Sequence, residues 1–145
     1  MVEPEEHYRR LERMYAGAPT NRYYAPELRV SEGQAQITIP IRPDFFHSAG
    51  AIHGSVYFKI LDDAAFFAAS SLVSDVFVLT VSFTTYIVRP VSRGFLRAVG
   101  SIVHQSRSLI VAESTAYDAE SELVARGSGT FIPSRIRLSP DVGYQ

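Results

Sequence analysis

The chain has 145 residues, 46% hydrophobic and 20% charged, values typical of a folded globular domain and not of a disordered chain. Its formal net charge of −1 gives no sign of a nucleic-acid or anionic-membrane surface. Cysteine is absent, which excludes disulfides, thiolate catalysis and cysteine-ligated metals and favours a cytoplasmic protein.

Three elements are expected in the first half. Residues 3–15 carry an apolar stripe at helical spacing, are too charged for a signal peptide, and predict a short helix. Residues 27–41 predict a hairpin that turns at Glu32–Gly33, because apolar and polar residues alternate after the glycine. Residues 55–71 lack glycine and proline and are apolar nearly all round a helical wheel, which predicts a long buried helix.

Strands are expected in the second half. Polar turns separate four β-rich runs, at residues 76–88, 95–105, 109–118 and 123–132. The order of a helix, a hairpin, one long helix and three or four antiparallel strands predicts a single α+β domain, residues 1–145. Its antiparallel sheet should wrap around the central helix.

Two adjacent carboxylates lie within the long predicted helix. Asp62 and Asp63 point about 100° apart and cannot share a face. Asp63 follows Lys59 by four residues, so we expect a surface ion pair and a solvated side chain. Asp62 shares its side with phenylalanines, where an unpaired charge is costly. It either bonds a neighbouring loop or acts as a base or nucleophile in a cleft.

Gly54 stands where the long helix should begin. Free N–H groups there can stabilise an oxyanion, although Gly54 and His53 also fit a plain helix start with a capping histidine. Gly54 and Asp62 are eight residues apart, roughly 12 Å along a helix, so they cannot both reach one carbonyl. If both act on one substrate, two chains must contribute, and this interpretation predicts a dimer.

The run at residues 76–88 predicts a strand with two distinct faces. Thr80, Ser82 and Thr84 share one face, which is either plainly solvent-exposed or lines a cleft. The opposite face carries Phe77, Leu79, Val81 and Phe83.

Three segments resemble the hotdog-fold acyl-CoA thioesterases of the phenylacetate-pathway (PaaI) type, in the 4-hydroxybenzoyl-CoA thioesterase superfamily. 'GAIHGSVYFKILDDA' is similar to their loop-and-helix signature, 'TVSFTTYIVRPV' to a strand, and 'LVARGSGTF' to their closing strand. The likeness covers a core of about residues 28–132. It implies a hotdog fold and an acyl-CoA substrate, with coenzyme A as part of that substrate and neither a separate cofactor nor a metal. It also implies a homodimer or homotetramer with active sites at the dimer interface.

The resemblance implies roles for individual residues. Asp62 matches the helix carboxylate that acts as nucleophile or general base, and Gly54 matches the oxyanion-hole N–H from the partner subunit. His53 matches the loop histidine that orders the site, and Thr80 the hydroxyl residue that positions the attacking water. His47 stands where these enzymes usually carry an asparagine that holds the thioester oxygen. The residues expected to contact coenzyme A are Ser82, Ser106, Arg107, Ser108 and Leu109.

Two other functions are weighed against hydrolysis. A hydratase or dehydratase acting on hydroxyacyl thioesters would need an acid–base histidine, usually in a proline-rich segment, and 'DFFHSAGAIHG' has no proline between its histidines. A non-catalytic module that only binds acyl-CoA would not need the carboxylate of Asp62. The sequence therefore favours an acyl-CoA hydrolase, with no nucleic-acid or membrane partner.

Overall fold

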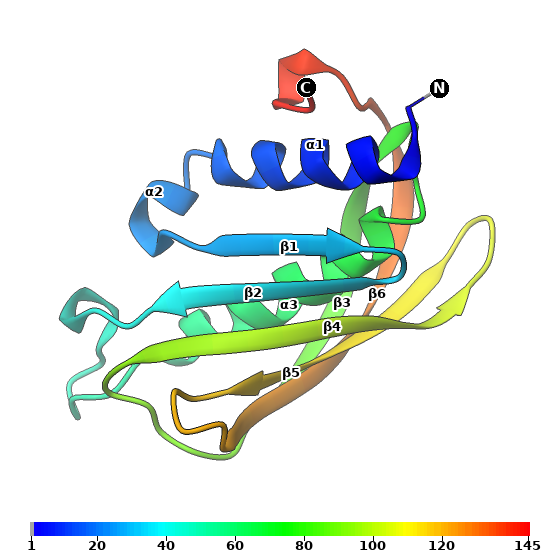
Figure 1. Ribbon diagram of the computed structural model, residues 1–145. Helices are drawn as coiled ribbons and strands as arrows, with labels where there is room; N and C mark the ends of the chain where they lie inside the picture. The colour runs from blue at the N-terminus through cyan, green and yellow to red at the C-terminus, as the bar shows by residue number, and fades with distance from the viewer. Residues whose placement is uncertain (1) are drawn as a thin grey trace.

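A six-stranded antiparallel sheet curves around one long helix, α3 (Gly54–Ser70), as Figure 1 shows. The computed structural model describes residues 2–145. The strands are β1 (Glu27–Ser31), β2 (Gln34–Pro40), β3 (Val76–Ile87), β4 (Phe95–Gln105), β5 (Ile110–Tyr117) and β6 (Leu123–Arg137). Their order in the sheet is β1-β2-β4-β5-β6-β3, so β1 and β3 form its two edges. The predicted α+β architecture is confirmed.

The remaining helices lie at the chain ends and in the loops. They are α1 (Pro4–Ala16), α2 (Asn21–Tyr24) and the 3₁₀ turns η1 (Pro43–Phe45) and η2 (Pro140–Val142). Helix α1 lies beside β1, where the Val30 N–H donates to the Glu12 carboxylate (2.8 Å) and the Arg9 guanidinium donates to the Val30 carbonyl (2.7 Å). These side chains cover the β1 edge of the sheet. Among residues 2–145 nothing pairs with the outer edge of β3.

The core depends on a close approach between α3 and the sheet. Gly100 of β4 lies directly under the helix, and a Cβ atom added there would stand 2.2 Å from the carbonyl oxygen of Ala64. Ser114 of β5 donates its hydroxyl to the carbonyl of Leu61 (2.7 Å). Small residues at this contact let the helix sit deep in the sheet, which fixes the position of Asp62 one residue further on.

The two-face prediction for β3 is wrong. The pairing of β3 with β6 shifts between Val76 and Val78 and again between Thr80 and Ser82, so that bulges interrupt the alternation. As a result Leu79 and Val81 are exposed, at 42% and 59%, whereas the Phe83 ring lies close to Gly127 and Gly129. A bulge adds a residue to one strand, so the apolar pattern before it and after it falls on opposite faces.

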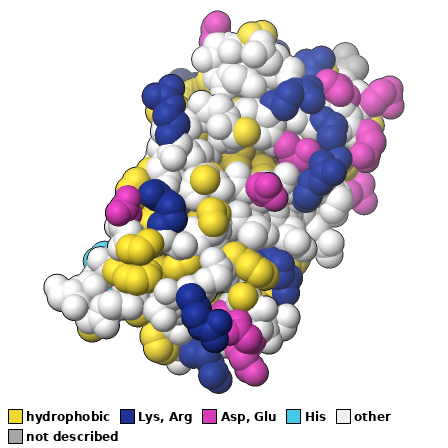
Figure 2. Space-filling view, turned by 60° about the vertical axis from the view of Figure 1, so that its left-hand side comes forward, with side chains coloured by type: hydrophobic (Ala, Val, Ile, Leu, Met, Phe, Trp, Pro, Cys, Tyr) yellow, Lys and Arg dark blue, Asp and Glu magenta, His cyan; other side chains and the backbone are white. Residues whose placement is uncertain are grey.

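Charges are mixed on the surface. In Figure 2, neighbouring basic and acidic side chains gather at the upper right of the face shown and again at its lower end, and apolar side chains lie mainly between these groups. On α1, Arg9 pairs with Glu12 (2.9 Å) and Arg10 with Glu6 (3.1 Å). Within residues 2–145 no helix has the length and apolar character needed to span a bilayer.

Candidate active site

Asp62 of α3 and Thr80 of β3 lie in direct contact. The Thr80 hydroxyl donates to Asp62 Oδ1 (3.0 Å), and both side chains are half-buried. Within residues 2–145 the second carboxylate oxygen, Oδ2, makes no hydrogen bond. Asp62 therefore does not cap a loop, and one of its oxygens is left free for chemistry.

Burial changes the acidity of this carboxyl. Desolvation, followed by the negative charge of Asp63, raises the pKa of Asp62 from 3.8 to about 6, against the opposing effects of the Thr80 hydrogen bond and the Lys59 charge. A carboxylate with this pKa is ionised at neutral pH and is a stronger base than an ordinary aspartate. This is the environment in which enzymes place general bases.

Asp63 is not the solvated residue expected from sequence. Its pairing with Lys59 is confirmed (2.7 Å), but the two side chains are only 16% and 14% exposed. The Tyr15 hydroxyl of α1 also donates to Asp63 Oδ2 (2.6 Å). Helix α1 covers this side of α3, which the sequence of α3 alone does not reveal. The cluster of Tyr15, Lys59 and Asp63 thus ties the N-terminal helix to the central one.

A cavity of about 610 Å³ opens beside Asp62. This volume lies in the range of small-molecule sites. Phe66 and Phe67 of α3 and Phe77 and Leu79 of β3 give it an apolar side, with Asp62 and Thr80 in the same wall. The end of α1, the loop that follows it and the C-terminal turn η2 form the rest of the lining.

The start of α3 forms a separate feature. His53 is the N-cap of the helix, and its Nδ1 accepts a hydrogen bond from the Ser55 N–H (3.0 Å). Gly54 is the first helical residue, and no partner for its N–H is found among residues 2–145. An N–H at this position carries the positive end of the helix dipole, so it can bind a negatively charged oxygen.

Gly54 opens onto a second cavity, of about 380 Å³. This cavity is also lined by His47 from the loop before α3 and by Ile87 and Val88 at the end of β3. His47 is exposed, and its Nδ1 accepts from the Ala49 N–H (3.0 Å). The structure therefore brings Gly54 and His47 together.

No residue lines both cavities. Asp62 and Thr80 lie at one, and Gly54 and His47 at the other, along the same helix and the same strand. Within a single chain the five expected catalytic residues form two separate groups, with His53 beside the second one.

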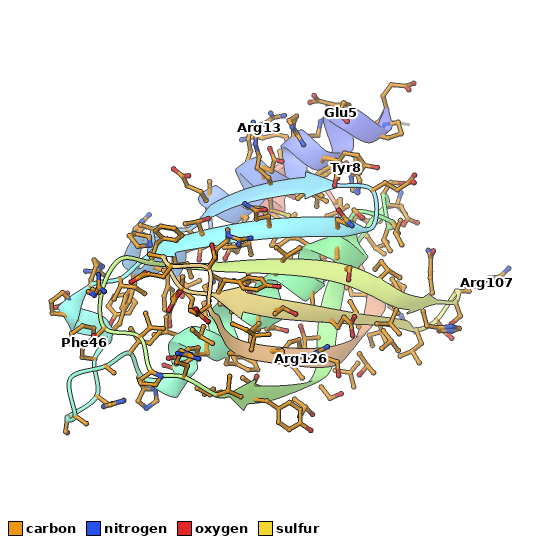
Figure 3. The ribbon with its side chains drawn as sticks, turned by 60° about the horizontal axis from the view of Figure 1, so that its bottom comes forward. Glu5, Tyr8, Arg13, Phe46, Arg107 and Arg126 are labelled. Atoms are coloured by element: carbon orange, nitrogen blue, oxygen red, sulfur yellow. The ribbon has the colours of Figure 1, made fainter. Side chains whose placement is uncertain are left out.

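The residues expected to contact coenzyme A lie apart from both groups. Ser106 to Leu109 form the exposed turn between β4 and β5, where the Ser106 N–H donates to the Leu109 carbonyl (2.8 Å). Figure 3 shows Arg107 at the tip of this hairpin and Phe46, next to His47, at the opposite end of the molecule. Ser82 Oγ is bonded to Thr130 Oγ1 (2.8 Å) on the exposed surface of β3 and β6.

Metal ligation finds no support in the part of the chain that the structure describes, residues 2–145. There, no three histidine, aspartate or glutamate side chains gather closely enough to hold an ion.

Comparison with known proteins identifies the family. The sequence pattern of the Thioesterase superfamily matches residues 49–125, more than half of the chain. The chain belongs to the Thioesterase superfamily. The matched region of this thioesterase includes Gly54, Asp62 and Thr80. A protein of Thermoplasma volcanium named "Putative esterase" is 26% identical over 108 residues, 74% of this chain and 80% of that protein.

Solved structures agree with this assignment. The PaaI protein of E. coli, from its phenylacetic acid degradation operon, has a TM-score of 0.85 at 18% identity, covering 95% of this chain and 100% of that one. A thioesterase family protein of Silicibacter pomeroyi has a TM-score of 0.80 at 23% identity, covering 90% and 97%. The predicted resemblance is confirmed: the protein is a thioester hydrolase with the hotdog fold, and that fold is similar to the fold of the PaaI protein.

Sequence reasoning missed part of the site. The sequence pattern places Tyr15 only in the apolar stripe of the first helix and indicates no role for residues 138–145, yet Tyr15, Asp141, Val142 and Gly143 line the cavity of Asp62. The segment 'SPDVG' carries a turn signal in its proline, aspartate and glycine. No local pattern indicates which cavity such a turn will cover.

Proposed function

We propose that this thioesterase hydrolyses an acyl-CoA to a free acid and coenzyme A, with Asp62 as nucleophile or general base. The observation that carries the proposal is the contact of Asp62 with Thr80 in the wall of a largely apolar cavity. An unpaired carboxylate there is unfavourable for stability, and its raised pKa suits proton abstraction.

Two routes are consistent with this geometry. As a general base, Asp62 takes a proton from a water held near the Thr80 hydroxyl, and the oxygen of that water attacks the thioester carbonyl. The C–S bond then breaks, and the coenzyme A thiolate that leaves takes the proton from Asp62. As a nucleophile, Asp62 Oδ2 attacks the carbonyl, the sulfur leaves as the coenzyme A thiolate, and water then cleaves the acyl–aspartate anhydride. In both routes negative charge develops on the carbonyl oxygen and needs a donor.

The Gly54 N–H is the proposed donor, supplied by a second chain. Eight residues of helix separate Gly54 from Asp62, roughly 12 Å, so one chain cannot place both at one carbonyl. The roles proposed for His53 and His47 follow from their places at the same helix start. His53 holds the loop through its cap, and His47 provides a second polar group toward the thioester oxygen.

The free edge of β3 supports the dimer that this site requires. On this strand Val81 and Tyr86 are 59% and 62% exposed, which is unusual for large apolar side chains on an unpaired edge. Antiparallel pairing of two β3 strands about a two-fold axis at Phe83 would set Leu79 opposite the partner's Ile87. Because Leu79 lines the Asp62 cavity and Ile87 the Gly54 cavity, that pairing brings the two cavities together.

Recognition of coenzyme A is proposed for the turn between β4 and β5 together with Ser82. Arg107 is exposed at the tip of that turn, and a guanidinium suits the phosphates of the nucleotide. Ser106, Ser108 and Leu109 offer backbone and hydroxyl groups beside it. Contacts this far from the thioester would act on binding more than on the chemical step.

The experiment is hydrolysis of a panel of acyl-CoAs, with the released thiol trapped by a chromogenic reagent. Asp62→Asn should lose on the order of 10²-fold or more in kcat, because the amide neither attacks nor takes a proton. Asp75→Asn makes the same change on an exposed residue outside both cavities and should leave kcat unaltered. Full activity of Asp62→Asn on the best substrate would show that another group carries the chemistry.

A further inference from the structure

The two ends of the chain meet at the cavity of Asp62. His7 of α1 is 3% exposed; its Nε2–H donates to the Ser70 carbonyl (2.9 Å), so Nδ1 of the neutral ring accepts from the Tyr144 hydroxyl (2.7 Å). Arg13 of α1 donates to the Gln145 carbonyl (2.6 Å). The C-terminal segment is thereby fixed against both α1 and the end of α3, and Figure 1 shows it folded back beside α1.

The turn before Tyr144 has a defined shape. The Ser139 hydroxyl accepts from the Asp141 N–H (3.2 Å), and the Gly143 N–H donates to the Pro140 carbonyl (2.9 Å). Gly143 adopts the left-handed conformation, with φ of 85°, and backs onto Met14. Glycine reverses the chain there without strain. Val142 is therefore held at the cavity by a closed turn on one side and by the buried Tyr144 on the other.

This turn lines the part of the cavity that α3 and β3 leave open, together with the end of α1 and the loop that follows it. Asp141, Val142 and Gly143 line it together with Met14, whereas Phe66 and Phe77 belong to the other wall. Val142 is half-buried and is the large apolar side chain of the turn. Val142 is thus an apolar side chain that a group filling the cavity beside Asp62 can contact.

The charges around the cavity are unfavourable for an anionic acyl group. Asp62, Asp63 and Asp141 line it, and the one cation among its lining residues, Lys59, is already paired with Asp63. A second carboxylate on the acyl group would meet net negative charge and would lose its hydration in an apolar site.

We propose that the C-terminal turn Pro140–Gly143, held by the contact of His7 with Tyr144, is a specificity element that limits the length of apolar acyl group this enzyme accepts. The inference rests on the proposed function, because it takes the cavity beside Asp62 as the acyl site. Val142 is the residue that sets the limit. Acyl groups that end in a carboxylate are excluded by the carboxylates already there.

The test is kcat/KM for acetyl-, butyryl-, dodecanoyl- and succinyl-CoA with two variants of Val142. Val142→Trp fills the cavity and should lower the dodecanoyl-to-acetyl ratio on the order of tenfold or more, the usual effect of unaccommodated carbon in an apolar pocket. Val142→Ala enlarges the cavity and should raise that ratio. Wild type should cleave succinyl-CoA much less well than butyryl-CoA, which has the same number of acyl carbons.

Val103→Trp is the matched control. It makes the same substitution on a 57% exposed residue of β4 that lines neither cavity, and it should leave all ratios unchanged. Thermal unfolding of each variant checks that its fold is retained. If Val142→Trp is unstable, the dodecanoyl-to-acetyl ratio of Val142→Ala still tests the inference.

Three outcomes would count against the inference. The turn does not set acyl length if both Val142 variants cleave acyl-CoA but change kcat/KM by one common factor for every substrate, or leave every kcat/KM unchanged. Succinyl-CoA cleaved as well as butyryl-CoA would remove the charge argument. A wild-type enzyme that releases no thiol from any acyl-CoA would instead overturn the proposed function itself, and the inference with it.

Discussion

At the scale of single residues, Asp62 occupies a place that is unfavourable for a carboxylate. Its pKa is raised from 3.8 to about 6, so the folded state binds the proton more tightly than the unfolded chain does. The contribution of this group to stability is therefore most favourable below pH 3.8 and is lost as the pH rises through 6. A residue kept ionised at neutral pH against this cost is a candidate for function.

The first prediction is that activity follows the ionisation of Asp62. Because the carboxylate is the reactive form, kcat/KM should be low well below pH 6 and should rise to a plateau above it. The measurement is a pH–rate profile with an acyl-CoA whose acyl group carries no charge, in buffers of constant ionic strength. A profile that stays level across this region would contradict Asp62 as the base.

The second prediction concerns Asp63, whose charge is the second-largest cause of the raised pKa of Asp62. Asp63→Asn removes that charge and frees Lys59, and both changes favour the ionised form of Asp62. The acidic limb of the profile should therefore move to lower pH, with the plateau little changed.

Asp75→Asn is the control for this shift, because Asp75 is exposed and lines neither cavity. If the acidic limb of the pH–rate profile stays in place in Asp63→Asn, or moves equally in the control, Asp63 does not raise the pKa of Asp62.

At the scale of elements, the contact between α3 and β4 sets the depth of the helix. A third prediction is that Gly100→Ala destabilises the fold by about 1–3 kcal/mol, since its Cβ would stand 2.2 Å from the Ala64 carbonyl oxygen. Denaturant unfolding monitored by circular dichroism measures this free energy. Gly17→Ala, where the nearest atom is 3.5 Å away, should be close to neutral; equal stability of both variants would contradict the close approach.

Most elements could be predicted from sequence because each has a local cause. The run of residues 55–71 without glycine or proline gave α3 to within one residue at each end, and the Glu32–Gly33 turn gave the first hairpin. The bulges of β3 could not be predicted, since they depend on pairing with β6 and not on the composition of β3. Strand β6 also extends to Arg137, five residues beyond the predicted end, because pairing with β3 continues there.

The same limit applies to the site. The family resemblance implied roles in one active site for Asp62 and Thr80; the structure shows a hydrogen bond between them, and the roles themselves stay predictions. The covering of Asp63 by Tyr15 and the turn at Val142 were missed, because both arise where the chain ends fold onto α3. Contacts between segments so far apart in sequence leave no periodic signal.

At the scale of the whole molecule, the proposed site requires two chains to meet. The fourth prediction uses two inactive variants, Asp62→Asn and Gly54→Pro. Proline suits the first position of a helix, and His53 before it has ψ of 149°, which a following proline favours. The substitution therefore removes the Gly54 N–H with little disturbance of α3. Gly54→Ala is the control: it adds a side-chain atom but keeps the backbone N–H, and it should remain active. Its activity would show that Gly54→Pro is inactive because it lacks the donor and not because a side chain was added.

Mixed dimers of the two inactive variants should regain activity. In such a dimer one site receives an intact Asp62 from one chain and an intact Gly54 from the other, so half of its sites are complete. The variants would be dissociated, mixed and reassociated, with differently tagged chains to verify the mixed species, and thiol release would then be measured. Each variant put through the same treatment alone should stay inactive.

No recovery in verified mixed dimers, or full activity of a monomer defined by light scattering, would show that Asp62 and Gly54 do not act together across an interface. Recovery to about half the wild-type rate per dimer would place the two groups in one site, because neither chain alone can span the roughly 12 Å of helix between them.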